Sequence, residues 1–171
     1  IILIYWPFVI KKNLFNKFKD SINFHPSYLP HLRGWYPHVH AKIKNLLWGI
    51  TLHEINYGID TGDIWTQKKI KIDLLNDNSN MYQIAQDELY KLFKINYLKI
   101  FNKKIKKKKQ LKKFRFLKKE DVVKYDNFSL TKKLTGIDFI KLFLSRSFKD
   151  KSFVKLNYKN TEYNLRLLIK K

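Results

Sequence analysis

The chain of 171 residues has the length of one domain. It contains no cysteine, which excludes disulfides, thiolate catalysis and cysteine-based metal sites. Its 36 Lys and Arg residues against 14 Asp and Glu give a formal net charge of +22, which raises the question of a nucleic-acid partner.

The type of basic residue argues against that partner. Nearly all of the positive charge is lysine, whereas specific contacts to phosphates and bases depend on arginine. The lysines are accompanied by many Ile and Asn, a bias that AT-rich coding alone produces. We therefore interpret most of the charge as compositional and do not expect nucleic acid as a partner.

The N-terminal part opens with a continuous apolar run over residues 1–5, which predicts a buried parallel strand. Trp6-Pro7 ends this run, and residues 9–19 are predicted to form a short amphipathic helix with Leu14, Phe15 and Phe18 inward. No secretory signal is evident, and the apolar run is too short to span a bilayer. We expect no membrane partner and a cytoplasmic location.

The most informative stretch is residues 21–74, which holds all five histidines and four of the five glycines. A strand over residues 21–24 is followed at once by His25-Pro26. Side chains two residues apart on a strand point the same way, so Asn23 and His25 share one face. Pro26 keeps His25 extended. The sequence thus predicts an amide and an imidazole side by side at a strand's end.

A long proline-rich loop over residues 25–37 then precedes a helix over residues 38–47 and a strand over residues 49–55. His53 on this strand is expected near the site, and because it has no metal-ligand partner at a recognisable spacing we expect no metal. The glycine-bearing loop that follows carries two carboxylates, Asp60 and Asp63. An amide, an imidazole and a carboxylate on loops are the parts that acyl transfer needs.

The remaining elements are a strand over residues 64–72 and a long helix that Ser79 or Asn80 can cap and that ends near residue 101. A dense lysine run over residues 103–113 predicts a solvated or mobile link. Beyond it we expect a helix over residues 136–144 and two strands over residues 153–158 and 161–168. Tyr158-Lys159-Asn160 would form the hairpin turn between them.

Three ordered motifs carry a family resemblance. N-x-H-P-S-x-L-P-x-x-R-G begins at Asn23, G-[IV]-T-x-H begins at Gly49, and G-I-D-T-G-D-I-x-x-Q begins at Gly58. Together they resemble the folate-dependent formyltransferases, which include enzymes acting on methionyl-tRNA, on glycinamide ribonucleotide and on nucleotide sugars. The resemblance is strong over residues 23–72 and weak over the flanks, from residue 1 to about residue 101.

The resemblance implies an α/β fold with a partial Rossmann-like sheet, followed by a small C-terminal helix and β-hairpin. The family has several strand–helix units before the motif strand, whereas this sequence begins with Ile1 and has one, and its single methionine is Met81. We therefore expect a fragment that lacks N-terminal strands. The expected division is a truncated catalytic core over residues 1–102, a basic linker over 103–113 and a small C-terminal region over 114–171.

By position, the catalytic Asn, His and Asp of the family fall on Asn23, His25 and Asp60. The implied reaction moves a formyl group from 10-formyltetrahydrofolate to a primary amine. Asn23, and His25 when protonated, could donate hydrogen bonds to the developing oxyanion. His25 could instead move protons, while Asp60 holds it in one tautomer or accepts a proton through water. The sequence does not divide these proton roles.

Beside the catalytic residues, the form R-G-W-Y-P-H differs from the R-G-A-A-P of tRNA-directed enzymes and resembles bacterial nucleotide-sugar N-formyltransferases. Trp35 and Tyr36 offer stacking faces to a sugar or base, or they pack the loop onto the sheet. Arg33 is assigned to substrate through its planar fork, with a structural ion pair as the alternative. Ser27 is also assigned to substrate, although closure of a local turn by its side chain is the favoured interpretation.

In the family, the segment that precedes the motif strand in sequence lines the folate pocket, so the resemblance assigns Trp6, Pro7 and Phe8 to folate. Ile59 and Asp63, from the loop that carries the third motif, are assigned to folate as well. The expected function is formylation of the amine of a nucleotide-linked amino-deoxy sugar in glycan or lipopolysaccharide biosynthesis. A methionyl-tRNA formyltransferase and a basic RNA-binding module on a degenerate enzyme scaffold are the alternatives. A homodimer is left open.

Overall fold

The computed structural model describes residues 1–6, 8, 10, 13, 17, 18, 20–110 and 115–170. The helix predicted over residues 9–19 falls mostly outside these residues, including its inward-facing Leu14 and Phe15. Pro7, assigned above to folate, also lies outside them.

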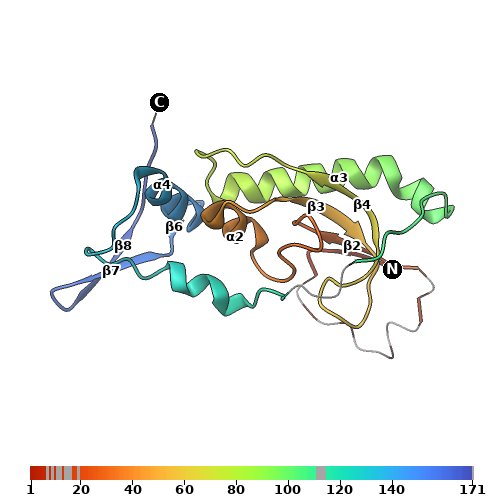
Figure 1. The fold of residues 1–171 in the computed structure, drawn as a ribbon, viewed down its shortest axis with the longest axis horizontal. Coiled ribbons are helices and arrows are strands. Elements are labelled where there is room, and N and C mark those ends of the chain that lie inside the picture. The colour runs from red at the N-terminus through yellow and green to blue at the C-terminus, as the bar shows by residue number, and fades with distance from the viewer. Residues whose placement is uncertain are drawn as a thin grey trace.

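A four-stranded sheet forms the centre of the fold, in the order β1 (Ile2–Ile4), β2 (Ile22–His25), β3 (Gly49–His53) and β4 (Ile64–Lys69) (Figure 1). β1 and β2 are parallel, and the other two pairs are antiparallel. The predicted strands are therefore present, although β3 and β4 end two and three residues before the predicted positions 55 and 72. The α/β class expected from the sequence is confirmed.

The burial predicted for the first strand is wrong. Ile2 and Ile4 are 51% and 62% exposed, because β1 lies at the edge of the described sheet with β2 on one side only. A continuous apolar run indicates a strand, but whether both of its faces are covered depends on elements that the run itself does not specify.

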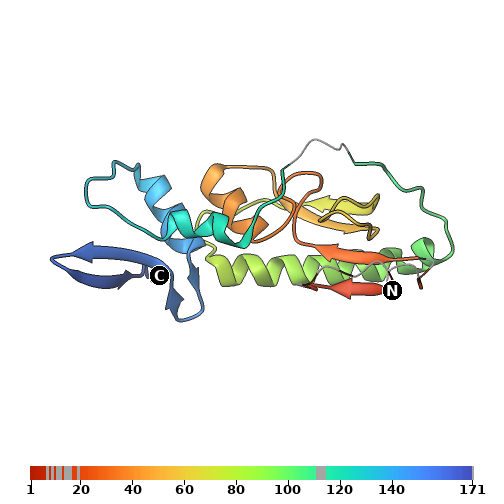
Figure 2. The ribbon, with the colours of Figure 1, turned by 90° about the horizontal axis from the view of Figure 1, so that it is seen from below.

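The main core lies between the sheet and α3 (Asn78–Phe101), which runs along one face of it (Figure 2). Met81, Ala85 and Leu89 come from successive turns of α3 and are 0–1% exposed. They form one cluster with the equally buried Ile50 and Leu52 of β3. The helix therefore holds β3 in place, and β3 is the strand that pairs with β2, which carries Asn23 and His25.

The cap of α3 differs from the prediction. Asp77 is the N-cap: its carboxylate accepts from the Asn80 amide N–H at 2.8 Å, and the Asn80 side chain accepts from the Asp77 N–H at 3.2 Å. This reciprocal pair is a capping box. Consecutive polar residues from Asp77 to Asn80 can each cap a helix, and the sequence alone does not select among them.

The C-terminal part lies at one end of the molecule, beside α2 (Pro37–Lys44) (Figure 1). It consists of the 3-10 helix η1 (Lys119–Tyr125), α4 (Gly136–Ser145), the short strands β5 (Ser147–Phe148) and β6 (Lys151–Ser152), and the hairpin of β7 (Val154–Tyr158) and β8 (Thr161–Leu165). Leu142, Phe143 and Val154 form a second core, against which Ile43 of α2 packs. The predicted hairpin turn is confirmed, with Lys159 and Asn160 at φ of 48° and 62°.

The chain after α3 returns to the sheet. Lys108 and Ile64 exchange both backbone hydrogen bonds, at 2.8 and 2.9 Å, so the lysine-rich stretch is fastened to β4 at this point. Further on, Leu117 pairs with the loop after β2: its N–H donates to Arg33 O at 2.7 Å, and its carbonyl accepts from Trp35 N at 3.0 Å. The division of the chain at residues 102 and 113 stays a prediction. No helix in the described ranges is both long and apolar enough to cross a bilayer.

Replacing Asp77 with Ala removes the side-chain acceptor of the capping box. We expect a loss of about 1 kcal/mol in the free energy of unfolding, measured by urea denaturation. Gln83→Ala, one turn further along α3, removes an exposed contact with Asp87 and should cost about 0.2–0.5 kcal/mol. Equal losses for the two variants would contradict the assignment of the cap.

Candidate active site

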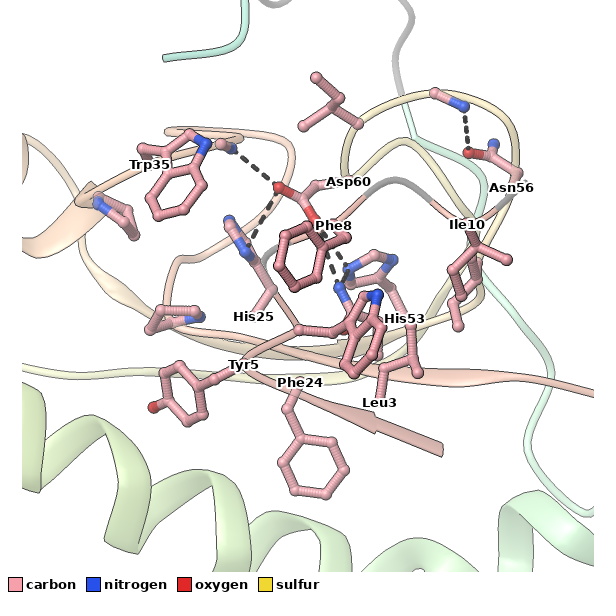
Figure 3. Close-up of a pocket in the computed structure, with 18 of the residues that line it drawn as sticks. Leu3, Tyr5, Phe8, Ile10, Phe24, His25, Trp35, His53, Asn56 and Asp60 are labelled. Carbon is pink, nitrogen blue, oxygen red and sulfur yellow. Dashed lines mark hydrogen bonds and ion pairs between the residues drawn. The ribbon is translucent and has the colours of Figure 1, made fainter. Parts of the chain in front are cut away.

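The site forms on one face of the antiparallel pair β2 and β3, around Asn23, His25 and His53. Asn23 and His25 alternate with the buried Phe24, so both face away from α3 and line one cavity of about 610 Å³ (Figure 3). Antiparallel pairing places Asn23 directly opposite His53. Both histidines are buried, with exposed fractions of 5% and 2%. The predicted shared face of Asn23 and His25 is thus confirmed, and His53 joins it as expected.

Asp60 connects these side chains. One carboxylate oxygen accepts from the Gly34 amide N–H at 2.9 Å and lies 3.5 Å from Nδ1 of His25. The other lies 3.4 Å from the Asn23 side-chain nitrogen and 3.5 Å from Nε2 of His53. The structure therefore brings together all three residues proposed as catalytic, around one carboxylate (Figure 3).

Local backbone conformation makes this convergence possible. Asp60 has a φ of +50°, a left-handed conformation that Asp tolerates better than most residues. Gly34 has a φ of +91°, and a Cβ there would lie 2.2 Å from the carbonyl oxygen of Leu117. At Gly62 a Cβ would lie 1.7 Å from the carbonyl oxygen of Glu54. The two glycines allow the loops to approach neighbouring backbone closely.

Electrostatics keep Asp60 ionised. Burial raises the pKa of the Asp60 carboxyl, but His25, His53 and the Gly34 N–H together outweigh burial and hold the pKa well below its usual range. Burial lowers the pKa of His25, with Asp60 acting in the opposite direction. The site thus combines a fixed negative charge with an imidazole whose proton is held loosely.

The hydrogen-bond partners assign the orientation of His53 and Asn23. Nδ1 of His53 lies 2.7 Å from the carbonyl oxygen of Glu54 and donates to it, so Nε2 is an acceptor. It accepts from the Asn23 side-chain N–H at 3.1 Å. The Asn23 amide nitrogen is therefore turned toward His53 and Asp60, and its second N–H donates to Asp60 at 3.4 Å.

His25 lies between two acceptors. Its Nε2 is 3.3 Å from the carbonyl oxygen of Leu32, and its Nδ1 faces Asp60. A neutral ring can donate to one of them, and a protonated ring can donate to both. This geometry suits a group that gains and loses a proton during a reaction.

Aromatic and apolar side chains line the rest of the cavity. Trp35 and Tyr36 lie on one side with ring centroids 5.8 Å apart, and Nζ of Lys119 lies 5.7 Å from the Trp35 ring. The predicted Trp6, Phe8 and Ile59 also line the cavity, together with Tyr82 of α3, which sequence analysis did not assign. Trp6 and Phe8 are 53% and 70% exposed.

Three residues assigned to ligands from the sequence do not line the cavity. Ser27 is fully buried, and its hydroxyl donates to His31 O at 2.9 Å, which matches the favoured interpretation of a local turn. Arg33 is 3% exposed, and its guanidinium donates to the Gln110 side chain at 2.8 Å. The backbone carbonyl of Asp63 accepts from Glu54 N at 2.8 Å. These hydrogen bonds of the three residues are therefore made with other groups of the protein.

A second cavity of about 660 Å³ adjoins the first and shares Tyr36, His38 and Tyr82 with it. Its other walls come from η1 and the β5–β6 region, including Lys119, Phe148 and other side chains of the C-terminal part. The site therefore extends from β2 and β3 toward the C-terminal part. Within the described ranges, no group of three or more His, Cys, Asp or Glu side chains has an arrangement that could hold a metal ion.

The sequence also matches a known protein family. A family model described as formyl transferase matches residues 1–94, which is more than half of the 171-residue chain. The chain belongs to the formyl transferase family. The resemblance inferred from the three motifs is thereby confirmed.

Relatives of two kinds match the chain. The dTDP-4-amino-4,6-dideoxyglucose formyltransferase of Mycobacterium tuberculosis is 33% identical over 66 residues, covering 39% of this chain and 28% of that protein. The methionyl-tRNA formyltransferase of Mycoplasma capricolum is 36% identical over 93 residues, covering 53% and 29%. The matched stretches thus span less than a third of the length of these curated relatives.

Solved structures extend the likeness to the C-terminal part. A sugar N-formyltransferase from a Shewanella species is similar with a TM-score of 0.87 at 25% identity, covering 99% of this chain and 70% of that one. A formyltransferase from Anoxybacillus kamchatkensis is 29% identical with a TM-score of 0.68, covering 72% and 66%. The latter was solved with UDP-4,6-dideoxy-4-formamido-L-AltNAc and tetrahydrofolate.

One buried histidine outside the site predicts acid sensitivity. His40 on α2 is fully buried against Tyr125, and burial, followed by Lys124 and Lys44, lowers its pKa to about 4. The unfolded chain binds this proton near pH 6.5, so stability falls as the pH drops from 6.5 toward 4, by about 1.4 kcal/mol per pH unit. His40→Gln should reduce the slope in urea denaturation between pH 6 and pH 5 by about 1.4 kcal/mol per pH unit, and the contribution of His38, whose pKa burial also lowers to about 4, should remain. An unchanged slope would show that His40 is protonated in the folded protein.

Proposed function

We propose that this protein transfers a formyl group from 10-formyltetrahydrofolate to the amine of a nucleotide-linked amino-deoxy sugar. The observation that carries the proposal is the convergence of Asn23, His25 and Asp60 on one cavity, beside the aromatic pair Trp35 and Tyr36. Family membership supports formyl transfer, and the sugar-directed relatives support the acceptor.

The reaction forms a bond between the amine nitrogen and the formyl carbon and breaks the bond from that carbon to the donor nitrogen. One proton passes from the amine to the leaving nitrogen, and negative charge builds on the formyl oxygen. Asn23 can donate to this oxygen by exchanging its long 3.4 Å bond to Asp60 for a bond to the substrate, and a protonated His25 can also donate to it.

The two titrating groups suit the proton transfer. Asp60 is held ionised, so it can stabilise a positive charge on the attacking amine or accept its proton through a water molecule. His25 is 3.5 Å from Asp60 and can return a proton to the leaving nitrogen. Because the two form a closely spaced pair, their titrations are coupled, and the roles belong to the pair.

The cavity suits a folate donor on its apolar side. Leu3, Trp6, Phe8 and Ile59 present apolar or aromatic faces beside the catalytic residues, as a flat pterin ring requires. Tetrahydrofolate in the similar Anoxybacillus formyltransferase supports this assignment. The donor would supply the formyl group, and these residues would bind and orient it.

The acceptor is assigned to the other side, where Trp35 and Tyr36 lie. Tyr36 is shared with the second cavity, so an acceptor that reaches past this ring has room for a nucleotide beyond the sugar. The exposed Lys119, whose ammonium group lies near the Trp35 ring, could bind the phosphates of that nucleotide. The two bulky rings leave less room for a folded tRNA end, whose backbone needs phosphate contacts. Methionyl-tRNA is the alternative acceptor, because the similar Mycoplasma protein is a methionyl-tRNA formyltransferase.

Catalysis by Asn23 and His25 is tested by single substitutions in the full-length protein. Asn23→Ala should lower kcat on the order of a hundredfold or more, because an oxyanion donor is lost, while the affinity for folate changes little. His25→Ala should lower kcat similarly. Steady-state kinetics and folate titration measure the two effects, and near-normal turnover of either variant would refute the assignment.

The acceptor is tested by Trp35→Ala. If the ring stacks on the acceptor, use of the nucleotide-linked amino sugar should weaken by roughly 1–3 kcal/mol in kcat/KM, with folate affinity nearly unchanged. Formylation of dTDP- and UDP-linked amino sugars is measured beside methionyl-tRNA. Formylation of the tRNA without any sugar turnover would overturn the acceptor and leave the formyl transfer intact.

A further inference from the structure

Gln110 lies just outside the site and contacts both loops that hold the catalytic groups. Its side-chain N–H groups donate to the carbonyl oxygens of Asp60, at 3.1 Å, and of Gly62. Its side-chain oxygen accepts from the guanidinium of Arg33, at 2.8 Å from Nη2 and 3.3 Å from Nε. One amide thus joins the loop after β3 to the loop after β2.

These are the same two loops that the Asp60 carboxylate joins from the inside. Arg33 is next to Gly34, whose N–H donates to that carboxylate at 2.9 Å. Gln110 therefore holds the backbone of Asp60 and the residue before Gly34 at the same time. A shift of either loop would change the distance from the carboxylate to Gly34 and to His25.

The contact uses both functions of an amide, so its chemistry is specific. A side chain at this place must donate to two carbonyl oxygens and accept from a guanidinium. Glutamate can accept from Arg33 but would place a carboxylate oxygen against the carbonyls of Asp60 and Gly62. Alanine makes neither contact. Two different substitutions can thus separate the two halves of the contact.

Gln110 is not needed to fasten its own segment to the sheet. Two residues earlier, Lys108 and Ile64 exchange two backbone hydrogen bonds, and Lys107 pairs with Glu54 at 2.9 Å. These contacts remain when the Gln110 side chain is removed. A purely structural role is therefore already filled, and the amide is left to fix the two loops relative to each other.

We propose that Gln110 is a positioning residue: it sets the distance of the Asp60 carboxylate from Gly34, His25 and Asn23. The proposal rests on the proposed function for its effect on turnover, but its geometric part does not. Misplacing a catalytic group by about an ångström can cost up to a hundredfold in rate. Loss of Gln110 should therefore lower kcat without removing any group that contacts the substrates.

The geometric part is tested by amide hydrogen exchange of Gly34, followed by NMR in the native protein and in Gln110→Ala. Gly34 N–H is held by Asp60, so its exchange should become on the order of tenfold faster or more when the loops separate. The matched control is Asn96→Ala, which removes a half-buried amide bonded to Leu92 O at 2.8 Å on α3 and does not line the cavity. It should leave Gly34 exchange unchanged. Unchanged exchange in Gln110→Ala would overturn the proposal, whatever the activity.

The functional part is tested by kinetics of the full-length protein. Gln110→Ala and Gln110→Glu should lower kcat on the order of tenfold with both KM values within about twofold, whereas Asn96→Ala should not. In an Asp60→Asn background, Gln110→Ala should lower the residual rate little further, because Gln110 acts through Asp60. A full further loss in that background, or an effect confined to KM, would contradict the positioning role. Faster Gly34 exchange in a protein without formyl transfer would contradict the proposed function alone.

Discussion

The site depends on one buried carboxylate. The side chain of Asp60 is 14% exposed, and a charge in that position is costly unless its partners compensate it. Gly34, His25, Asn23 and His53 supply these partners from two strands and one loop. Removing the carboxylate would leave the Gly34 N–H, an Asn23 side-chain N–H and Nδ1 of His25 without their shared acceptor. The same interaction therefore organises the site and stabilises the loops around it.

The strands that present these partners are positioned by the core on their other face. Phe24 packs against Phe93 of α3, with ring centroids 5.1 Å apart, while its neighbours Asn23 and His25 face the cavity. Alternation along β2 converts packing on one face into placement of polar groups on the other. A one-residue shift in the pairing of β2 with β3 would turn Asn23 and His25 toward α3 and Phe24 toward the cavity. Hydrophobic burial of Phe24 thus fixes the register on which the site depends.

Much of this could be predicted from the sequence, because local signals carried it. Alternation placed Asn23 and His25 on one face, the motif order placed Asp60 beside them, and the lysine–asparagine turn placed the C-terminal hairpin. Residue type failed where several neighbours are chemically equivalent, and Asp77 was missed as the cap of α3 for this reason.

The contacts of Gln110 could not be predicted from the sequence, because they depend on distant parts of the chain. It stands in a lysine-rich run without periodicity, and its partners are two carbonyl oxygens and a guanidinium 77 residues earlier in the chain. Pairings of this kind are fixed by the register of the Lys108–Ile64 bridge, which no local pattern specifies. The buried guanidinium of Arg33 takes part in the same contact, which residue type alone did not indicate.

The long separations also determine how the site responds to destabilisation. Asn23 and Asp60 are 37 residues apart, and Arg33 and Gln110 are 77 residues apart, so these contacts form only when the sheet, α3 and the returning chain are all in place. Local opening of any one of these elements separates the loops before the whole fold is lost. Substitutions far from the cavity, such as those in the buried face of α3, can therefore reduce the fraction of molecules with an assembled site. For this reason turnover of any variant has to be compared with its stability before a residue is assigned to the chemistry.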